Sequence, residues 1–232
     1  MIQYERQQSI IDYLEKNRLA TIRELARAVY TSEASVRRDV CELEKSGYVE
    51  KVYGGVLLTK YKSSIIPARL RDNENHLAKD GIAAKAAKLI KSGDTVMMDA
   101  STTAFRICKH IKGLKNIKII TNNLRICGEF TESDDVKVYC TGGAYSPRNS
   151  CFLGSYAEQF IKTVNADILF FSAQGIGDDG VISDVDENEV SMRKVMLSQS
   201  RRKVFLCDSS KMGVSKPFKV CDRDDIDEII TE

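Results

Sequence analysis

The stretch from Ser32 to Gly55 constrains this chain most, because a helical pattern, a glycine and two short strand patterns follow one another within it. Thr31 or Ser32 can cap the start of the helix, and Gly47 stands where a left-handed helix end is expected. One helical face has the spacing of a buried stripe and consists of Val36, Val40 and Leu43. The opposite arc is expected to face solvent, and it carries Ala34, Ser35, Arg37, Arg38, Cys41 and Lys45.

The solvent arc of this helix suits the major groove of DNA. Arginine can donate to two acceptors on a guanine edge at once, and serine can reach a base edge or a phosphate. Ser35, Arg37 and Arg38 lie together near the front of the helix. An ordinary solvated helix face explains the same residues equally well, so the flanking segments decide between the two interpretations.

The segment before this helix predicts two further helices. Residues 3–16 form the first, with an inward face of Ile10, Ile11 and Leu14. Thr21 caps the second, and Glu24, three residues later, completes a capping box. The inward face of this second helix consists of Ile22, Leu25, Ala26 and Val29. Residues 30–33 then connect it to the arginine-bearing helix. A short helix, a short turn and an exposed second helix are typical of a helix-turn-helix.

Two strand-like runs follow Gly47, at residues 48–52 and 56–59, and they flank Gly54 and Gly55. Two strands joined by such a turn form a β-ribbon, and a ribbon placed after a helix-turn-helix predicts the wing of a winged helix. The residues expected near the phosphate backbone on this wing are Lys51, Tyr53 and Lys60.

Residues 5–60 resemble the DNA-binding domain of DeoR-type bacterial repressors of sugar operons. The resemblance is carried by Arg6, residues 32–40, Leu43, Gly47 and residues 52–55. The family usually has Thr where this chain has Ser35, which keeps the hydroxyl, and His where it has Tyr53, which removes a cationic phosphate contact. The resemblance implies that the operator is bound by Ser32, Ser35, Arg37 and Arg38. Lys51 and Tyr53 are added from their expected place on the wing.

Composition agrees with such a protein. The 232 residues are 43% hydrophobic and 29% charged, as in ordinary globular chains. No apolar run approaches the roughly 20 residues that span a bilayer, and the N-terminus lacks the layout of a signal peptide, so a cytoplasmic location is expected. Seven cysteines, an odd number without metal-ligand spacing, predict reduced thiols and argue against disulfides or a metal site.

The domain boundary is predicted from a loss of pattern. Residues 60–76 contain a proline and have neither helical nor strand period. They are expected to link a winged helix-turn-helix domain at residues 1–59 to a second domain at residues 77–232.

From residue 77 onward, apolar runs alternate with helical patterns. The runs lie at residues 95–98, 117–120, 136–140, 168–171 and 204–207. Short apolar strands separated by helices predict an α/β domain with a mainly parallel sheet. Ligands bind such sheets beyond the carboxyl ends of the strands. Polar or glycine-rich segments follow all five runs, at residues 99–103, 121–123, 141–143, 173–177 and 208–211.

The first of these strand ends has the clearest chemistry. Residues 101–103, Ser-Thr-Thr, stand between a strand and a helix start, where free backbone N–H groups and three hydroxyls suit a phosphate monoester. Alternatively, these residues only cap the helix. Gly142 and Gly143 permit close approach to a ligand or simply form a turn, and Lys211 pairs with a phosphate or lies in solvent. Residues 175–177 lack the further glycine of a dinucleotide fingerprint, so no nucleotide cofactor is predicted.

Residues 77–230 resemble the C-terminal sensor domain of the same family, whose fold is similar to phosphosugar isomerases of the ribose-5-phosphate isomerase type. Family members usually have Gly where this chain has Ser101. The resemblance implies a phosphorylated sugar or sugar alcohol as effector. The residues expected to hold it are Asp99, Ser101, Thr102, Thr103, Asn122, Gly142, Gly143, Gly175 and Lys211.

An acidic cluster further along the chain precedes Arg193. It consists of Asp184, Asp186, Glu187 and Glu189. Acidic side chains stabilise the N-terminal end of a helix, so a solvated helix start is predicted. Acceptance of sugar hydroxyls by Glu187 or Glu189 is the alternative.

Two classes of function remain: a ligand-responsive transcriptional repressor, and a phosphosugar isomerase-like enzyme with an appended DNA-binding domain. Isomerases resembling this fold have paired acids after the fourth strand, where this chain has residues 172–175, Ser-Ala-Gln-Gly, with no general base. His76 and His110 join no catalytic constellation. A module without ligand is disfavoured by the five polar strand ends. The prediction is a non-enzymatic repressor without cofactor, whose partners are operator DNA, a phosphorylated sugar and further copies of the chain as a dimer or tetramer, with no membrane.

Overall fold

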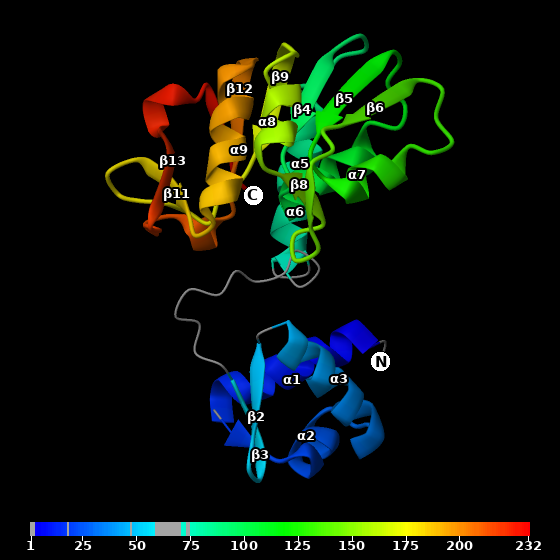
Figure 1. The fold of residues 1–232 in the computed structure, drawn as a ribbon, viewed down its shortest axis with the longest axis vertical. Helices are drawn as coiled ribbons and strands as arrows, with labels where there is room; N and C mark the ends of the chain where they lie inside the picture. The colour runs from blue at the N-terminus through cyan, green and yellow to red at the C-terminus, as the bar shows by residue number, and fades with distance from the viewer. Residues whose placement is uncertain (1–2, 18, 47, 59–70, 73–74) are drawn as a thin grey trace. The chain divides into compact units, whose positions relative to one another are not determined.

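The computed structural model describes residues 3–17, 19–46, 48–58, 71–72 and 75–232, and its chain divides into two compact units, residues 1–70 and 71–232 (Figure 1). The helices and strands of the first unit are α1 (Gln3–Asn17), β1 (Leu19–Ala20), α2 (Ile22–Ala28), α3 (Glu33–Lys45), β2 (Val49–Val52) and β3 (Gly55–Leu58). This is the predicted winged helix-turn-helix.

Local sequence signals set the ends of its helices as predicted. The Thr21 side chain accepts from the Glu24 N–H, and the Glu24 side chain accepts in return from the Thr21 N–H, which forms the capping box of α2. The Ser32 hydroxyl accepts from the Ser35 N–H and caps α3. The predicted helix stop at Gly47 lies outside the described residues. The stripe of α3 is fully buried and consists of Val36, Val40 and Leu43.

One strand of this unit was not predicted. The two-residue β1 pairs antiparallel with β3, so the sheet order is β1-β3-β2. The pairing explains Gly55, because a Cβ at this position would lie 2.8 Å from the Ala20 carbonyl oxygen. A two-residue strand has no periodicity of its own, so it could not be recognised in the sequence.

The second unit holds a six-stranded sheet. Its helices are α5 (His76–Ala87), α6 (Thr102–Ile107), α7 (Leu124–Glu129), α8 (Ser155–Ile161) and α9 (Glu187–Ser198). Its sheet runs β14 (Glu228–Ile230), β12 (Ser200–Leu206), β9 (Ala166–Phe171), β4 (Thr95–Met98), β5 (Ile117–Thr121) and β6 (Val136–Cys140). All neighbouring pairs are parallel, which confirms the predicted parallel sheet.

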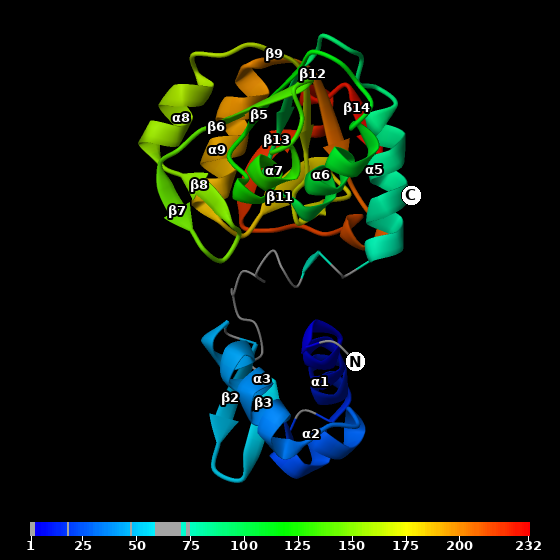
Figure 2. The same cartoon turned by 90° about the vertical axis from the view of Figure 1, so that its right-hand side faces the viewer.

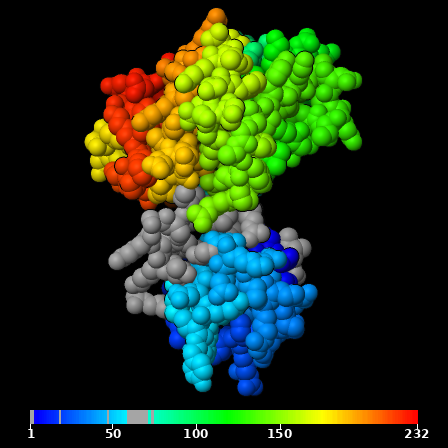
Figure 3. Space-filling view, viewed as in Figure 1, coloured from blue at the N-terminus to red at the C-terminus, as the bar shows by residue number. Residues whose placement is uncertain are grey.

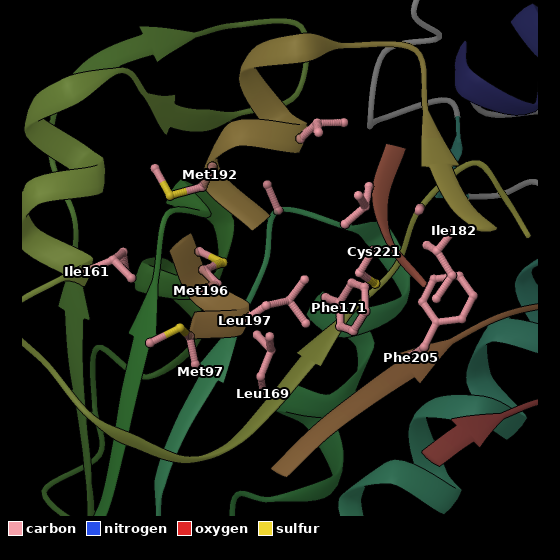
Figure 4. Close-up of a cluster of buried hydrophobic side chains, with 14 of the residues drawn as sticks. Met97, Ile161, Leu169, Phe171, Ile182, Met192, Met196, Leu197, Phe205 and Cys221 are labelled. Atoms are coloured by element: carbon pink, nitrogen blue, oxygen red, sulfur yellow. The ribbon is translucent and has the colours of Figure 1, made fainter. Parts of the chain in front are cut away.

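Both faces of this sheet are covered (Figures 1 and 2). Helices α5, α6 and α7 pack on one face, where Ile82, Ile107 and Ile126 join one buried cluster. Helices α8 and α9 pack on the other face with a second cluster. Figure 4 shows this second cluster, in which the rings of Phe171 and Phe205 lie 5.2 Å apart. Coverage on both faces explains why the strands are continuous apolar runs.

The sequence did not predict the short strands and 3-10 turns of this unit. A separate antiparallel sheet contains β10 (Gly175–Ile176), β11 (Val181–Asp184) and β13 (Phe218–Asp222), and a hairpin contains β7 (Ala144–Ser146) and β8 (Cys151–Leu153). Single 3-10 turns are η1 (Cys108–His110), η2 (Ser209–Lys211) and η3 (Arg223–Asp225). These strands are too short to show an alternating pattern, and only their pairing partners define them.

The end of the predicted linker belongs to the second unit, which is a correction to its boundary at residue 76. Arg71 donates from Nη2 to Asn149 Oδ1 at 2.9 Å, and Asp72 binds Arg106. Asn75 donates to Asp208 at 3.1 Å, and α5 already begins at His76. The contacts of these side chains are long-range, so the local sequence carries no sign of them. Residues 59–70 lie outside the described residues.

Candidate DNA-binding and effector sites

The solvent face of α3 presents the predicted DNA-reading residues. Arg37 and Arg38 are exposed, and Arg37 Nη2 lies 3.6 Å from Glu33 Oε2. The Ser32 and Ser35 hydroxyls lie 3.0 Å apart. The Ser32 hydroxyl also accepts from the Ser35 N–H and so caps α3. The Ser35 hydroxyl has no such capping role and is therefore better placed to bind DNA.

The wing stands beside α3. The Lys51 ammonium lies 2.9 Å from Cys41 Sγ and 2.8 Å from Glu44 Oε2, so it is bound to α3. These hydrogen bonds, the one to Cys41 first, raise the pKa of Lys51. Tyr53 at the tip is fully exposed, and the ribbon projects from the surface of its unit (Figure 3, cyan). A groove of about 640 Å³ between wing and helix is lined by residues that include Arg23, Arg37, Cys41, Lys51 and Gly54.

An ion pair with a buried carboxylate holds α3 on α1. Arg6 Nε lies 2.5 Å from Asp39 Oδ2, and Arg6 Nη2 donates to Asp39 Oδ1 at 3.2 Å. The Asp39 side chain is fully buried, and the hydrogen bond between the two raises the pKa of Arg6. In the sequence, Arg6 was noted only as part of the family resemblance. In the structure, Arg6 holds α3, the helix that carries Arg37 and Arg38, against α1.

The predicted effector loops all follow strands of the parallel sheet, so they meet at one edge. Both carboxylate oxygens of Asp99 accept hydrogen bonds from other groups of the protein. Its carboxylate accepts from the Ser101 N–H at 3.0 Å, from the Ser172 N–H at 3.3 Å and from Arg193 Nε at 2.9 Å. Ser101 caps α6 by accepting from the Ala104 N–H at 3.2 Å. Asp99 and Ser101 therefore hold the loop in shape.

Asn122 is placed differently. Its side chain is 2% exposed, and its Nδ2 donates to the Phe152 carbonyl at 3.1 Å. Its Oδ1 is buried and has no hydrogen-bond partner among the described residues. Buried amide oxygens are usually satisfied, so this acceptor requires an explanation. A ligand that donates a hydrogen bond at this edge supplies one.

Two of the predicted glycines are needed by the protein's own backbone. A Cβ on Gly175 would lie 2.1 Å from the Val214 carbonyl oxygen, and one on Gly143 would lie 2.8 Å from that of Leu153. Gly143 also has a φ of +108°, which favours glycine. Gly142 has a φ of +65° and open space around its Cα. Close packing therefore accounts for Gly143 and Gly175 without any ligand.

Lys211 joins two strand ends. From the turn after β12 its Nζ donates to Ser172 Oγ at 2.8 Å, just past β9, and it lies 3.7 Å from Asp208 Oδ2. Burial, the largest influence, lowers the pKa of Lys211. Because Ser172 also donates its N–H to Asp99, Lys211 is connected to the loop of residues 99–103. The Lys211 side chain as a whole is 21% exposed, so part of it reaches the surface at this edge.

The sequence did not predict a buried cluster of charged side chains around Arg193. Its guanidinium binds Asp99 and Asp184 at 2.9 Å each and Glu189 at 2.7 Å, and all four side chains are buried. The prediction of a solvated acidic helix start is therefore wrong for Asp184 and Glu189. It holds for the Asp186 side chain, which accepts from two N–H groups at the start of α9. The Glu189–Arg193 spacing of four residues was the available signal.

This cluster extends to the first residues of the unit. Asn149 donates to Glu189 Oε1 and accepts from Arg71, so hydrogen bonds run without a gap from Arg71 to Asp99. The neighbouring Asp72 binds both Arg106 on α6 and Arg125 on α7. Helices α6 and α7, which follow the loops of residues 99–103 and 121–123, are thus bound to the first residues of this unit.

Among the described residues, no group of three or more His, Cys, Asp or Glu side chains is arranged to hold a metal ion. Within the same residues, no helix is long and apolar enough to cross a membrane.

A winged helix followed by an α/β domain with polar strand ends defines a ligand-responsive DNA-binding regulator. Residues 6–62 match the family model of the DeoR-like helix-turn-helix domain, and residues 74–232 match that of the DeoR C-terminal sensor domain. The chain belongs to the DeoR family of transcriptional regulators, as its sequence motifs predicted.

Curated relatives agree along nearly the whole chain. The chain is 31% identical to the HTH-type transcriptional regulator GolR of Listeria innocua, covering 100% of this chain and 91% of that protein. It is 31% identical to the transcriptional repressor AccR of Agrobacterium fabrum, covering 98% and 89%. These relatives are regulators and repressors, so this chain is a transcriptional regulator and not an enzyme. Among solved structures, it is similar to ribose 5-phosphate isomerase A of Methanocaldococcus jannaschii, with a TM-score of 0.44, 15% identity, and coverage of 60% and 55%.

Proposed function

We propose that this regulator represses a sugar-utilisation operon and is controlled by a phosphorylated sugar or sugar alcohol bound at the strand-end edge of its C-terminal unit. The observation that carries the proposal is the buried Oδ1 of Asn122 at that edge, which has no hydrogen-bond partner in the part of the chain that the structure describes. Leaving such an acceptor unsatisfied costs about 1–3 kcal/mol. A sugar hydroxyl would satisfy it.

The charge at the same edge supports a phosphate on the ligand. The Lys211 side chain is 21% exposed, and burial of its ammonium lowers its pKa. An incoming phosphate would hold the lysine in its charged form and form a charge-assisted bond of roughly 1.5–3 kcal/mol. Thr102 and Thr103 on α6 provide hydroxyl groups at the loop that Ser172 connects to Lys211. An unphosphorylated sugar lacks the anion and is expected to bind poorly.

DNA recognition is assigned to Ser35, Arg37 and Arg38, with Lys51 and Tyr53 on the wing. The groove between α3 and the wing supports this assignment, since both of its walls carry basic side chains. One helix-turn-helix reads few base pairs, so we propose a homo-oligomer, a dimer or tetramer, that binds repeated half-sites. Operator binding also implies a cytoplasmic protein.

The contacts of residues 71 and 72 suggest how effector binding reaches the DNA-binding unit. Asp72 binds α6 and α7, the helices that follow the loops of residues 99–103 and 121–123. Arg71 is connected to Asp99 through the hydrogen bonds that begin at Asn149. The chain leads from here, through residues 59–70, to the winged helix. Linkage requires that the effector bind the free and DNA-bound states with different free energies. We propose that this anchor changes with the effector loops and creates that difference.

Calorimetric titration with a panel of sugar phosphates tests the proposal. Lys211→Ala and Asn122→Ala are each expected to weaken binding of the active sugar phosphate about tenfold or more, the equivalent of losing one such hydrogen bond. Lys219→Ala is the matched control, because Lys219 is also paired to an aspartate, Asp222, but is exposed on β13. Its affinity should equal that of the wild type. Wild-type affinity in both site variants, or equal binding of the unphosphorylated sugar, contradicts the proposal.

A further inference from the structure

The turn between α2 and α3 holds a tyrosine in an unusual backbone conformation. Tyr30 has a φ of +50°, in the left-handed region that L side chains rarely adopt. Its N–H donates to the Arg27 carbonyl at 3.3 Å, and the next N–H, that of Thr31, donates to the Ala26 carbonyl at 3.0 Å. These two hydrogen bonds form a Schellman motif, which closes α2 and places a left-handed residue at the position of Tyr30.

A tyrosine is a poor residue for this position. Glycine is the usual choice, because it has no Cβ to oppose the left-handed conformation, and asparagine is also used. The ring of Tyr30 is not compensated by burial, since the residue is 92% exposed. The fold of the DNA-binding unit therefore gains little from this side chain and carries the strain of its backbone. Strain of this kind is found where a residue contacts a ligand.

The place of Tyr30 in the chain indicates what it contacts. Tyr30 stands two residues before Ser32, the cap of α3, so the two Cα atoms lie within roughly 7 Å of each other. Arg27, in the last turn of α2, is exposed as well and adds a positive charge to this surface. A helix-turn-helix presents the start of its second helix to the major groove of DNA, and phosphates line both sides of that groove. A side chain that projects from this turn is therefore beside the phosphate backbone when α3 is in the groove.

We propose that Tyr30 is a DNA-backbone contact of the winged helix, whose hydroxyl donates a hydrogen bond to a phosphate beside the groove that α3 enters. This inference rests on the proposed DNA recognition by α3. A phosphate carries no base identity, so the contact fixes the position of α3 on the duplex and adds affinity without adding sequence preference. The left-handed turn directs the ring outward, and DNA binding supplies the interaction that the fold itself does not.

Tyr30→Phe tests the hydroxyl alone. The full chain is titrated by fluorescence anisotropy against a random-sequence duplex and against an operator isolated by selection from a random library. Binding to both DNAs is expected to weaken about tenfold, the equivalent of one hydrogen bond to a charged group. Because tyrosine is neutral, the dependence of binding on salt should stay as in the wild type, whereas loss of a lysine contact to phosphate lowers that slope by about 1.

Tyr30→Asn separates binding from folding. Asparagine suits the left-handed position better than tyrosine, so the urea midpoint of the DNA-binding unit, measured in the full chain, should equal or exceed that of the wild type. DNA binding should nevertheless fall at least as far as in Tyr30→Phe. Tyr156→Asn is the matched control, because Tyr156 is 79% exposed on α8 of the other unit, and it should bind DNA as the wild type does. A lower urea midpoint in Tyr30→Asn would show that the tyrosine supports the fold, and it would overturn the proposal.

A second probe identifies the phosphate. Each phosphate of the selected operator is replaced in turn by an uncharged methylphosphonate. At one position the replacement should weaken binding of the wild type but not of Tyr30→Phe, because that variant has already lost the contact. The proposal is overturned if no position distinguishes the two proteins, if Tyr30→Phe binds both DNAs like the wild type, or if its loss is confined to the operator, which indicates base reading.

Arg37→Ala, assayed on the same DNAs, keeps this inference apart from the proposed function. If Arg37→Ala weakens operator binding while the Tyr30 variants do not, only the tyrosine contact is wrong. If Arg37→Ala also binds like the wild type, the proposed recognition by α3 fails with it.

Discussion

Asp72 Oδ1 lies 2.9 Å from Arg106 Nη2, which binds the entry of the C-terminal unit to helix α6. The second oxygen of the same carboxylate binds Arg125 on α7, whose guanidinium lies 3.8 Å from the centroid of the Phe105 ring. Both arginine side chains are partly buried, so their attraction to Asp72 is screened less than that of an exposed ion pair. One carboxylate therefore connects the two helices that follow the first two candidate effector loops.

The first prediction concerns this connection. Asp72→Asn removes the charge that holds both arginines, so effector binding should alter operator affinity less than it does in the wild type. Asp80→Asn is the matched control, since Asp80 also binds Arg106, at 2.8 Å, but is on α5. Operator affinity measured with and without effector gives the result. An effector response in Asp72→Asn as large as that of the wild type would contradict the proposed coupling.

The second prediction concerns DNA reading. Arg37→Ala and Arg38→Ala should each cost on the order of 1–3 kcal/mol in operator binding if the arginine reads a base. Lys16→Ala on the exposed face of α1 is the control for a general loss of positive charge. Binding is compared at one salt concentration by fluorescence anisotropy. The assignment is wrong if both arginine variants bind like the control.

The third prediction concerns the stability of the winged helix. Asp39→Ala leaves the partly exposed Arg6 guanidinium without its buried partner, and losing hydrogen bonds to a charged group costs about 1.5–3 kcal/mol. Urea denaturation of the full chain should show an earlier transition for the DNA-binding unit. Asp12→Ala, an exposed aspartate on α1, should leave that transition in place. A transition unchanged by Asp39→Ala would show that the pair contributes nothing to the fold.

The fourth prediction concerns domain organisation. Limited trypsin digestion should cut first between Thr59 and Arg71, because the sequence there has no pattern of a packed element. The released C-terminal fragment should fold, assemble and bind effector. A first cut inside residues 76–232, or an unfolded fragment, would contradict the predicted domains.

The fifth prediction concerns acid stability. Burial tends to raise the pKa of Asp80, but hydrogen bonds from Lys109 and Arg106 outweigh it, and the net pKa is lowered. A lowered folded-state pKa contributes stability above the ordinary aspartate pKa, and this contribution is lost as pH falls through the folded value. Asp80→Asn should therefore cost more stability at neutral pH than near pH 3, as followed by urea titrations. A constant difference at both pH values would contradict the pairing.

Local sequence determined much of the DNA-binding unit. The spacing of Val36, Val40 and Leu43 predicted the buried side of α3, and hence the exposed side that holds Arg37. The capping box at Thr21 and Glu24 predicted where α2 begins. These signals lie within one or two helical turns, and backbone geometry links such positions directly. The five apolar runs predicted the parallel sheet for the same reason, since both of its faces had to be buried.

Only the tertiary structure decided which distant side chains meet. Arg193 binds Asp99, 94 positions earlier in the chain, and Asp72 binds Arg106 across 34 positions. Gly175 is required because a Cβ there would meet the carbonyl oxygen of Val214, 39 positions later in the chain. Periodicity encodes which side of an element is buried, but the pairing of buried polar groups depends on sheet order and loop path, which no local pattern contains.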